Sequence, residues 1–355
     1  MRALLLLPLL AALAGGRCQE APPPDSREAQ VARGKAAYAK TCAICHGPAG
    51  EGYAADNAPA LAGADLLVTA SDAFLYETIA RGRPGTVMSG WAKEHGGPWD
   101  EGQIQDLVAL MRSWQQGTMR PLDQAPLRPD GQDGKTLYGK HCASCHGATG
   151  IEGPNNRLAH PQLLDLASDG FLRATILEGR AGTPMKAFRD TLRPAEVDAI
   201  IAYLRQHPAQ VPEVGRPVAT GSAPVDLPSG GEPDFPKGAR FIGVDLAARE
   251  MRRGARILFV DARPPSDFQA GHVRGAINLP FYEAPERADQ VPKGAWVLTY
   301  CGCPHAESGE VAEVLRGRGH DRVAILDEGW GPWKTRGYPI EGPARAATAS
   351  ARSKH

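Results

Sequence analysis

A cysteine-containing segment occurs twice in this chain, and its two copies lie one hundred residues apart. Residues 134–150 repeat the glycine, lysine, tyrosine, cysteine and histidine positions of residues 34–50 at the same spacing. Later landmarks recur after a loop that is three residues shorter in the second copy: Phe74, Leu75, Gly82, Arg83 and Met88 match Phe171, Leu172, Gly179, Arg180 and Met185. Apolar residues at helical spacing close both copies, at 104–112 and 197–205. The chain therefore contains two copies of one domain.

Each copy contains the pattern Cys-x-x-Cys-His, which is the covalent attachment motif of c-type haem. The residues concerned are Cys42, Cys45, His46, Cys142, Cys145 and His146. Two thiols one helical turn apart can add to the two vinyl groups of a porphyrin, and the adjacent histidine then reaches the iron. A Cys-x-x-Cys pair can also form a redox disulfide or half of a zinc site. Because the motif is repeated with its histidine, we expect two covalently bound c-type haems.

A methionine opposite each motif histidine would complete the coordination of the iron and raise its reduction potential. The first copy offers Met88, Met111 and Met119. Met88 has a counterpart in Met185, and both follow a Gly-Thr-x sequence, whereas Met111 aligns with Leu204 on an apolar helix face. Met119 has no counterpart. The repeat therefore predicts Met88 as the ligand of the first iron and Met185 as the ligand of the second.

Three further histidines occur in the repeated region. His95, His141 and His160 lie in polar stretches or beside a Cys-x-x-Cys-His motif. We expect these side chains to face solvent rather than to bind a metal.

The landmarks of both copies resemble those of the class I cytochrome c family. That family has a first helix ending in Cys-x-x-Cys-His-Gly, a loop that carries methionine, and a closing helix that crosses the first. The resemblance covers about residues 28–118 and 128–208. It implies two all-α domains that carry electrons between redox partner proteins, with a partly exposed haem edge as the exit.

A different pattern begins after residue 209. Residues 210–237 are rich in proline and glycine and lack periodicity, so we interpret them as a linker. Short apolar runs at 255–263 and 295–301 predict buried strands, and 310–319 predicts an amphipathic helix followed by another strand. Strands that alternate with helices indicate an α/β domain with a mostly parallel sheet.

Residues 239–342 resemble a rhodanese-like domain. The resemblance rests on VDARPPSDFQAGHVRGAINLP, which begins at Val260, and on LDEGWGPWKTRGYPIE, which begins at Leu326. In that family a cysteine ends a central strand, and a loop of backbone N–H groups at a helix start surrounds its sulfur, which stabilises a thiolate or persulfide. Cys301 stands at that position. Four other residues belong to the fold signature and are expected to be structural: Asp261, Arg263, His272 and Asn278.

The loop after Cys301 departs from the pattern of active sulfurtransferases. Such enzymes usually carry a basic residue near the end of this loop, whereas this chain has Glu307 and no arginine there. A carboxylate at this place would oppose an anionic sulfur and raise the pKa of the thiol. His305 could offset this charge or donate a proton, and Cys303 could act as a resolving thiol. Alternatively, Cys301 and Cys303 form an idle or structural pair.

The N-terminus predicts export. Residues 1–17 contain one early positive charge, an apolar run and then small residues, which is typical of a secretory signal sequence. The run is shorter than the roughly 18 to 20 residues that span a bilayer. Cys18 follows directly, so this cysteine is either a lipid anchor or an idle residue in a tail. Since haem is attached to thiols outside the cytoplasmic membrane, we expect a periplasmic protein.

Composition excludes one class of partner and leaves two functions open. The 40 basic and 40 acidic side chains balance, so nothing suggests a nucleic-acid partner. One hypothesis is a dihaem electron carrier whose rhodanese-like domain binds a sulfur anion, a persulfide or a partner protein. The alternative is an enzyme that performs sulfur oxidation or sulfur transfer at Cys301 and passes electrons to the two haems.

Overall fold

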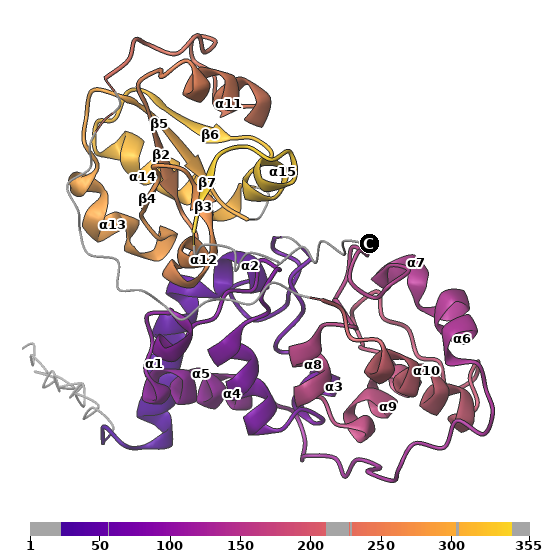
Figure 1. Cartoon of the computed structure of the whole chain (residues 1–355). Coiled ribbons are helices and arrows are strands. Elements are labelled where there is room, and N and C mark those ends of the chain that lie inside the picture. The colour runs from indigo at the N-terminus through magenta and orange to yellow at the C-terminus, as the bar shows by residue number, and fades with distance from the viewer. Residues whose placement is uncertain (1–22, 56, 211–226, 228, 303–304, 343–355) are drawn as a thin grey trace, which may run out of the picture.

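The computed structural model describes residues 23–55, 57–210, 227, 229–302 and 305–342. Residues 1–17, Cys18, Cys303 and most of the expected linker lie outside these ranges. Figure 1 shows three units: a first helical domain (α1 to α5), a second helical domain (α6 to α10) and a C-terminal domain (β1 to β7). Within the described residues, no helix is both long and apolar enough to cross a membrane.

The first helical domain is built around the crossing of its first and last helices. Its elements are α1(Arg27–Thr41), α2(Ala43–His46), α3(Ala64–Leu67), α4(Asp72–Arg81), the 3-10 helix η1(Lys93–His95) and α5(Glu101–Trp114). The Ser26 side chain accepts a hydrogen bond from the N–H of Ala29 and starts α1. A reciprocal capping box between Asp100 and Gln103 starts α5. These caps define where the two long helices begin.

The second helical domain repeats this arrangement with shorter helices. Its elements are α6(Gly134–His141), α7(Ala143–His146), α8(Pro161–Leu166), α9(Asp169–Glu178) and α10(Pro194–Gln206). The expected closing segments at 104–112 and 197–205 therefore lie inside α5 and α10. All-helical structure in both copies confirms that part of the expected fold class.

The repeated glycine at the start of each copy is explained by the helix crossing. A methyl group on Gly34 would lie 2.1 Å from the carbonyl oxygen of Asp106 in α5. A methyl group on Gly134 would lie 2.0 Å from the carbonyl oxygen of Ala199 in α10. Both distances are shorter than a van der Waals contact, so only glycine permits this close approach of the two helices.

The C-terminal domain is a parallel sheet covered by helices. Its elements are β1(Phe241–Ile242), α11(Val244–Arg252), β2(Ile257–Asp261), α12(Pro265–Ala270), β3(His272–Val273), β4(Ile277–Asn278), η2(Phe281–Glu283), α13(Ala284–Arg287), η3(Ala288–Gln290), β5(Trp296–Tyr300), α14(Ala306–Gly317), β6(Val323–Leu326), α15(Trp330–Thr335) and β7(Ile340–Glu341). The five strands β1-β6-β5-β2-β4 pair in parallel, and β3 pairs with β7 in a separate antiparallel ribbon. The mostly parallel α/β domain is thus confirmed.

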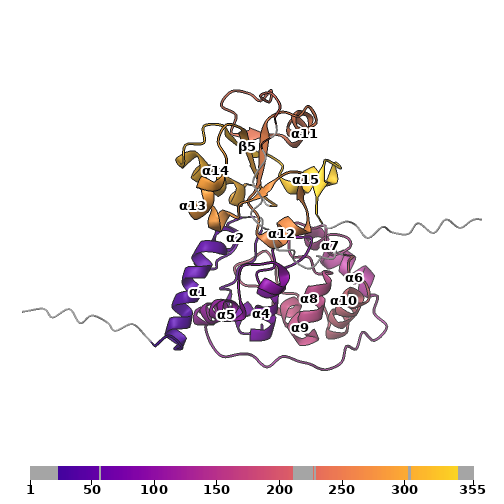
Figure 2. The ribbon, with the colours of Figure 1, turned by 60° about the vertical axis from the view of Figure 1, so that its left-hand side comes forward.

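The C-terminal domain rests on the first helical domain, close to α2. Figure 2 shows α2 below α13 and beside α12, and α14 also lies against α2. One hydrophobic cluster continues across the contact, where the rings of Trp91 and Tyr282 are 5.6 Å apart. An ion pair of 3.1 Å joins Lys40 to Glu286 at its edge. This contact places the end of β5 near the first haem motif.

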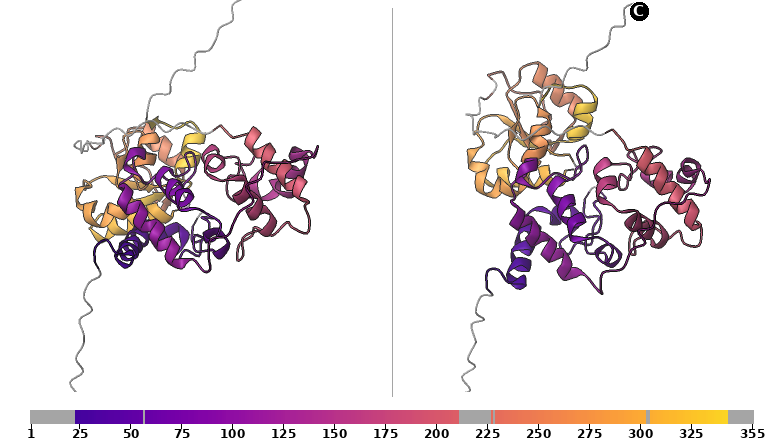
Figure 3. Two further views of the ribbon diagram at one scale, coloured as in Figure 1. Left: turned by 90° about the horizontal axis from the view of Figure 1, so that it is seen from below. Right: turned by 60° about the horizontal axis from the view of Figure 1, so that its bottom comes forward.

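The two helical domains pack side by side, as both views in Figure 3 show. Phe74 of the first copy contacts Phe171 of the second at a ring separation of 4.8 Å, and these residues are equivalent in the repeat. Helices α4 and α8 also touch. Equivalent surfaces therefore meet, as they do in a two-fold symmetric dimer.

Candidate functional site

The first Cys-x-x-Cys-His motif forms a single helical turn at the end of α1. Cys42 caps the C-terminus of α1, and α2 then carries Cys45 and His46. His46 is buried, and its Nδ1 lies 2.8 Å from the carbonyl oxygen of Pro59. A carbonyl accepts only from N–H, so Nδ1 carries the proton and Nε2 keeps the lone pair that a metal needs. Burial lowers the pKa of His46, which favours this neutral ring.

The second motif repeats this geometry. His146 is buried, and its Nδ1 lies 2.8 Å from the carbonyl oxygen of Asn156. A tyrosine in the preceding helix fixes each motif, because Tyr38 and Tyr138 donate hydrogen bonds to the carbonyl oxygens of Gly47 and Gly147. Both copies therefore present two thiols and one neutral imidazole nitrogen in the same way.

The two candidate methionines sit in loops of the same conformation. The N–H of Met88 donates to Oγ1 of Thr86 at 3.0 Å, and the N–H of Arg83 donates to the carbonyl oxygen of Met88 at 2.7 Å. In the second copy, Met185 makes the equivalent bonds with Thr183 and Arg180, at 3.1 and 2.8 Å. The recurring Gly-Thr-x-Met sequence thus encodes one loop structure.

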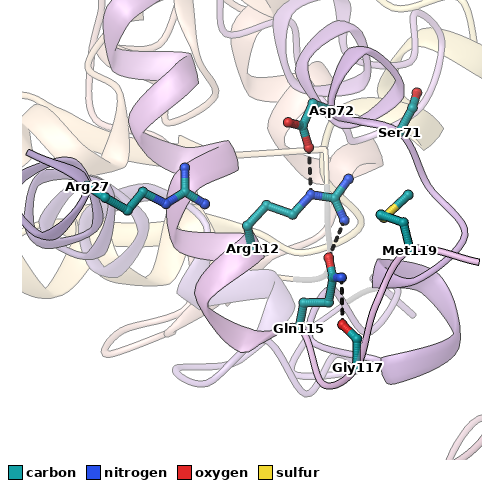
Figure 4. A pocket seen from close by; sticks show the side chains of 7 residues that line it. All are labelled: Arg27, Ser71, Asp72, Arg112, Gln115, Gly117 and Met119. Atoms are coloured by element: carbon teal, nitrogen blue, oxygen red, sulfur yellow. Dashed lines mark hydrogen bonds and ion pairs between the residues drawn. The ribbon is translucent and has the colours of Figure 1, made fainter.

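The other two methionines of the first copy occupy different surroundings. Met111 is buried within α5 and belongs to the cluster shared with the second helical domain. Met119 is 45% exposed. In Figure 4 its side chain lies in a shallow surface pocket near Arg112, which pairs with Asp72 at 2.6 Å. Met88, in contrast, is partly buried and packs against the cluster that the first helical domain shares with the C-terminal domain.

This donor set fits a covalently attached haem in each helical domain. Such a haem is held by two thiols on one helical turn, by an imidazole and by the thioether of a methionine in a loop. Among the described residues, no group of three His, Cys, Asp or Glu side chains is placed to bind a metal ion by itself. The roles of the individual ligands stay predictions.

Cys301 stands directly after β5, at the carboxyl edge of the parallel sheet. Its side chain is 1% exposed, and its sulfur lies 3.3 Å from Oγ of Ser308. Helix α14 begins at Ala306, after His305 in the left-handed conformation (φ 66°). A helix N-terminus beside the sulfur favours a thiolate or another anionic sulfur.

Glu307 lies near the sulfur of Cys301, as the sequence led us to expect. The side chain is buried in the first turn of α14, and burial is the main cause that raises its pKa well above the usual value, with the nearby sulfur of Cys301 adding to the effect. A raised pKa favours the neutral acid at neutral pH. The contribution of the Cys301 sulfur to this raised pKa has the sign of the repulsion that the sequence predicts between Glu307 and an anionic sulfur.

Arg263 is a residue of this site that the sequence analysis assigned to structure alone. It pairs with Asp261 at 2.6 Å, and both are buried. Its Cδ lies 3.6 Å from the place that a Cβ on Gly302 would occupy, and its charge acts on Glu307. A basic group therefore reaches the Cys301 loop from the end of β2. The signal was the Asp-x-Arg sequence directly after a buried strand.

The other proposed residues of the loop have separate positions. His305 is half-buried, and its Nε2 lies 3.2 Å from Oδ1 of Asp327 while its ring packs on Phe241. Cys303 lies outside the described residues. The catalytic roles suggested for Cys301, Cys303 and His305 stay predictions.

The Cys301 loop contacts the loop that carries Met88. A Cβ on Gly302 would lie 3.3 Å from Cγ1 of Val87. Next to the methionine, Oγ of Ser89 donates a hydrogen bond of 2.6 Å to the carboxylate of Asp267 in α12. Cys301 and Met88 also pack against one hydrophobic cluster. The candidate sulfur site and the first candidate haem site are thus neighbours.

His160 does not face solvent, so that expectation is wrong. The side chain is fully buried between the two helical domains, and its Nε2 lies 3.0 Å from the carbonyl oxygen of Pro84. His95 and His141 are half-buried. The burial of His160 could not be predicted from the sequence, because the residues that bury its side chain include Pro84 of the other helical domain.

Comparisons with known proteins define the class of protein as a cytochrome c joined to a rhodanese-like domain. A family model for subunit III of cbb3-type cytochrome c oxidase matches residues 29–111 and 129–204, and one for the rhodanese-like domain matches 244–336. The oxidase subunit FixP of Bradyrhizobium diazoefficiens is 30% identical over 49% of this chain and 59% of its own. A sulfurtransferase of Allochromatium vinosum is 33% identical over 87 residues.

The Allochromatium match covers 24% of this chain and 80% of the sulfurtransferase. The solved rhodanese-like domain of an Anabaena protein is 23% identical over 33% of this chain and 89% of its own, with a TM-score of 0.28. The chain belongs to the rhodanese-like family through its C-terminal domain, and its N-terminal half consists of two cytochrome c domains of the cbb3 subunit III type. It spans between 20% and 61% of the length of four other curated relatives.

Proposed function

We propose that the protein is an exported dihaem c-type cytochrome that carries electrons in the periplasm and binds a sulfur species at Cys301. One haem would be held in each cytochrome domain, by Cys42, Cys45, His46 and Met88 in the first and by Cys142, Cys145, His146 and Met185 in the second. When bound, each haem accepts and releases one electron, and a thioether ligand favours the ferrous state.

The chain itself supplies orientation at each haem site. The bonds from Nδ1 of His46 to Pro59 and of His146 to Asn156 hold the rings so that Nε2 can bind iron. The hydrogen bonds within the two methionine loops set where each thioether lies. These supports are the same in both domains, so we expect both irons to have the same ligand types.

The surroundings of Cys301 support binding of a small anionic sulfur. The first turn of α14 offers its positive end, and Ser308 lies within hydrogen-bond distance of the sulfur. Arg263 adds a cation, although its pairing with Asp261 neutralises part of that charge. A protonated Glu307 would act as a hydrogen-bond donor rather than as a repelling anion.

A second candidate function, oxidation of the bound sulfur, is favoured by the contact between the Cys301 and Met88 loops. The simplest balanced step joins the thiol of Cys301 to a hydrosulfide. Two S–H bonds break and one S–S bond forms, and two protons and two electrons leave. If one haem is bound in each cytochrome domain as proposed, two ferric haems would supply the oxidant, with a capacity of one electron each. The protons would pass to solvent.

Sulfur binding can be tested by incubating the whole protein with thiosulfate or polysulfide, digesting it and measuring the masses of the peptides. We expect the peptide that contains Cys301 to gain the mass of one sulfur atom. The Cys303→Ser variant should retain that gain. Cys301→Ser should lose it. A gain that persists in Cys301→Ser would show that the sulfur binds elsewhere and would contradict the proposal.

The electron acceptor is proposed to be another periplasmic redox protein. Cys145 in the second domain is exposed, whereas Cys45 in the first is only partly so, which makes the second haem the more accessible exit. Export and the possible lipid anchor at Cys18 concern residues outside the described ranges. Mass measurement of the purified N-terminal peptide would show both cleavage and any attached lipid.

A further inference from the structure

The edge of the sheet that carries Cys301 faces another domain of the same chain. Ligands of parallel α/β sheets bind outside the carboxyl ends of the strands, and Cys301 directly follows β5 at that edge. The cysteine is nevertheless 1% exposed, and a Cβ on the next residue, Gly302, would lie 3.3 Å from Cγ1 of Val87 in the first cytochrome domain. A sulfur donor that approaches from this side therefore meets the loop that carries Met88.

Two contacts hold the domains together beside this site. Oγ of Ser89 donates a hydrogen bond of 2.6 Å to the carboxylate of Asp267. The ring of Trp91 lies 5.6 Å from that of Tyr282, and both rings belong to the hydrophobic cluster that includes Cys301. We call the arrangement that has the hydrogen bond between Ser89 and Asp267 the docked state. Access to the sulfur of Cys301 thus depends on contacts that the cytochrome domain supplies.

Val87 lies at the rim of this contact. One side of its side chain faces Gly302, yet the residue is 40% exposed, so another side faces solvent. The equivalent position in the second cytochrome domain is Pro184, which is exposed. Figure 1 shows that the C-terminal domain sits above α2 of the first domain, away from α7 of the second. Only the first copy therefore carries a rim beside the Cys301 site.

The basic side chains at this contact are committed to partners within the chain. Arg263 pairs with Asp261 at 2.6 Å, and Lys40 pairs with Glu286 at 3.1 Å. A large organic donor such as glutathione persulfide brings carboxylates that need cations of their own in a buried place. An inorganic sulfur species needs only the positive end of α14 and the hydroxyl of Ser308. Charge and space both favour the smaller donor.

We propose that the first cytochrome domain selects the sulfur donor of Cys301 by size. Small inorganic species such as polysulfide react in the docked state, whereas glutathione persulfide and protein persulfides react only after the C-terminal domain separates from the Met88 loop. Val87 and Ser89 are then specificity-determining residues, although they belong to another domain than Cys301. This inference rests on the proposed binding of sulfur at Cys301 and names the class of donor for it.

The transfer step itself is the same for both classes of donor. The thiolate of Cys301 attacks the terminal sulfur of the donor, one S–S bond forms at Cys301, and one S–S bond of the donor breaks. The shortened polysulfide, or the thiolate of glutathione, leaves with the electron pair of the broken bond. No external oxidant is needed. Any difference in rate between the donors therefore reports access and not a different reaction.

The test compares two thiol reagents on the full haem-loaded chain in a Cys303→Ser background. Methyl methanethiosulfonate is the small reagent, and glutathione disulfide is the large one. The mass of the peptide that contains Cys301 gives each rate, which is divided by the rate in the denatured chain. We expect the large reagent to be retarded more than the small one.

Ser89→Ala should change the two rates differently. Loss of a hydrogen bond to a carboxylate should raise the population of the separated state roughly 5- to 30-fold. The rate with glutathione disulfide should rise by the same factor, because that reagent needs the separated state. The rate with methyl methanethiosulfonate should stay unchanged. Lys186→Ala, at the equivalent position of the second domain, is the matched control and should leave both rates unchanged.

Val87→Ala provides an independent arm, because a smaller rim should raise the rate with glutathione disulfide, whereas Pro184→Ala should not. Equal normalised rates of the two reagents in the Cys303→Ser chain would overturn the inference. Equal acceleration of both reagents in Ser89→Ala would also overturn it, as would an unchanged ratio of rates in both Ser89→Ala and Val87→Ala. Failure of sulfur binding is distinguishable, because polysulfide would then add no mass at Cys301 while the selectivity between the two reagents persists.

Discussion

The two cytochrome domains share one sequence pattern but occupy different environments. The C-terminal domain covers the first domain next to its methionine loop, where Asp267 accepts a hydrogen bond from Ser89. The second cytochrome domain forms hydrogen bonds to the same loop through His160 and Arg157. The second domain has Lys186 where the first has Ser89, and its Cys145 is exposed. Both copies therefore keep the groups proposed to bind haem, while contacts between domains cover the first site and leave Cys145 of the second exposed.

The largest difference between the copies should follow from removal of one haem. Cys42→Ala/Cys45→Ala should yield a denatured chain with one covalent haem fewer, and it should also weaken docking of the C-terminal domain, because α2 forms part of that contact. The matched change Cys142→Ala/Cys145→Ala should remove one haem without affecting this docking. Mass spectrometry and limited proteolysis would measure the two effects. A wild-type mass equal to the processed polypeptide alone would contradict the cytochrome assignment.

The methionine assignment predicts equal spectroscopic losses in the two domains. Met88→Ala and Met185→Ala should each remove one haem's share of the weak absorption between thioether sulfur and ferric iron, and each should lower one reduction potential. Met119→Ala, at an exposed methionine, is the control and should leave the absorption unchanged. An unaltered spectrum in both Met88→Ala and Met185→Ala would show that the ligands lie elsewhere.

The contact between Ser89 and Asp267 predicts a stability difference between equivalent positions. Ser89→Ala removes a hydrogen bond to a carboxylate and should destabilise the docked C-terminal domain by about 1–2 kcal/mol. Lys186→Ala, at the equivalent position of the second domain, should change stability by less than about 0.5 kcal/mol. Hydrogen exchange of the full chain would measure both. Equal effects would mean that this contact does not hold the domains together.

A smaller effect is expected from Glu307. Its pKa is higher in the folded protein than in the unfolded chain, so its contribution to stability is complete at low pH and is lost as pH rises from the unfolded pKa toward the folded one. Glu307→Gln should consequently be more stable than the wild type at pH 8, with little difference at pH 4. Thermal unfolding of both proteins at pH 4 and pH 8 would measure this difference in stability. A stabilisation by Glu307→Gln that is seen only at pH 4 would contradict the prediction.

Local sequence predicted those features that depend on local chemistry. The apolar run at 295–301 became β5 because its side chains are buried on both faces of a parallel sheet. The repeated Gly-Thr-x-Met sequence indicated matching loops, since Thr86 and Thr183 bond to the backbone two residues later. Helices α5 and α10 extend beyond the expected segments, because Asp100 and Pro194 start them outside the apolar stretch.

Features that arise between distant segments could not be predicted in the same way. His160 is a polar-loop residue in sequence, and only packing against Pro84 of the other domain buries it. Arg263 reaches the Cys301 loop because β2 and β5 are neighbours in the sheet. The raised pKa of Glu307 follows mainly from its burial. In each case the deciding contact joins residues far apart in the chain.

The most direct test of coupling between the Cys301 site and the first cytochrome domain is anaerobic mixing of the oxidised protein with hydrosulfide, thiosulfate, polysulfide or glutathione persulfide. Haem absorbance is followed in the wild type, in Cys301→Ser and in Cys303→Ser. Oxidation of sulfur at Cys301, the second candidate function, predicts a reduction phase with at least one donor that is absent in Cys301→Ser and also slowed by Met88→Ala. Equal reduction in the wild type and Cys301→Ser with every donor would contradict sulfur oxidation at Cys301 and would leave the first proposal, a dihaem cytochrome whose third domain binds a sulfur species without oxidising it.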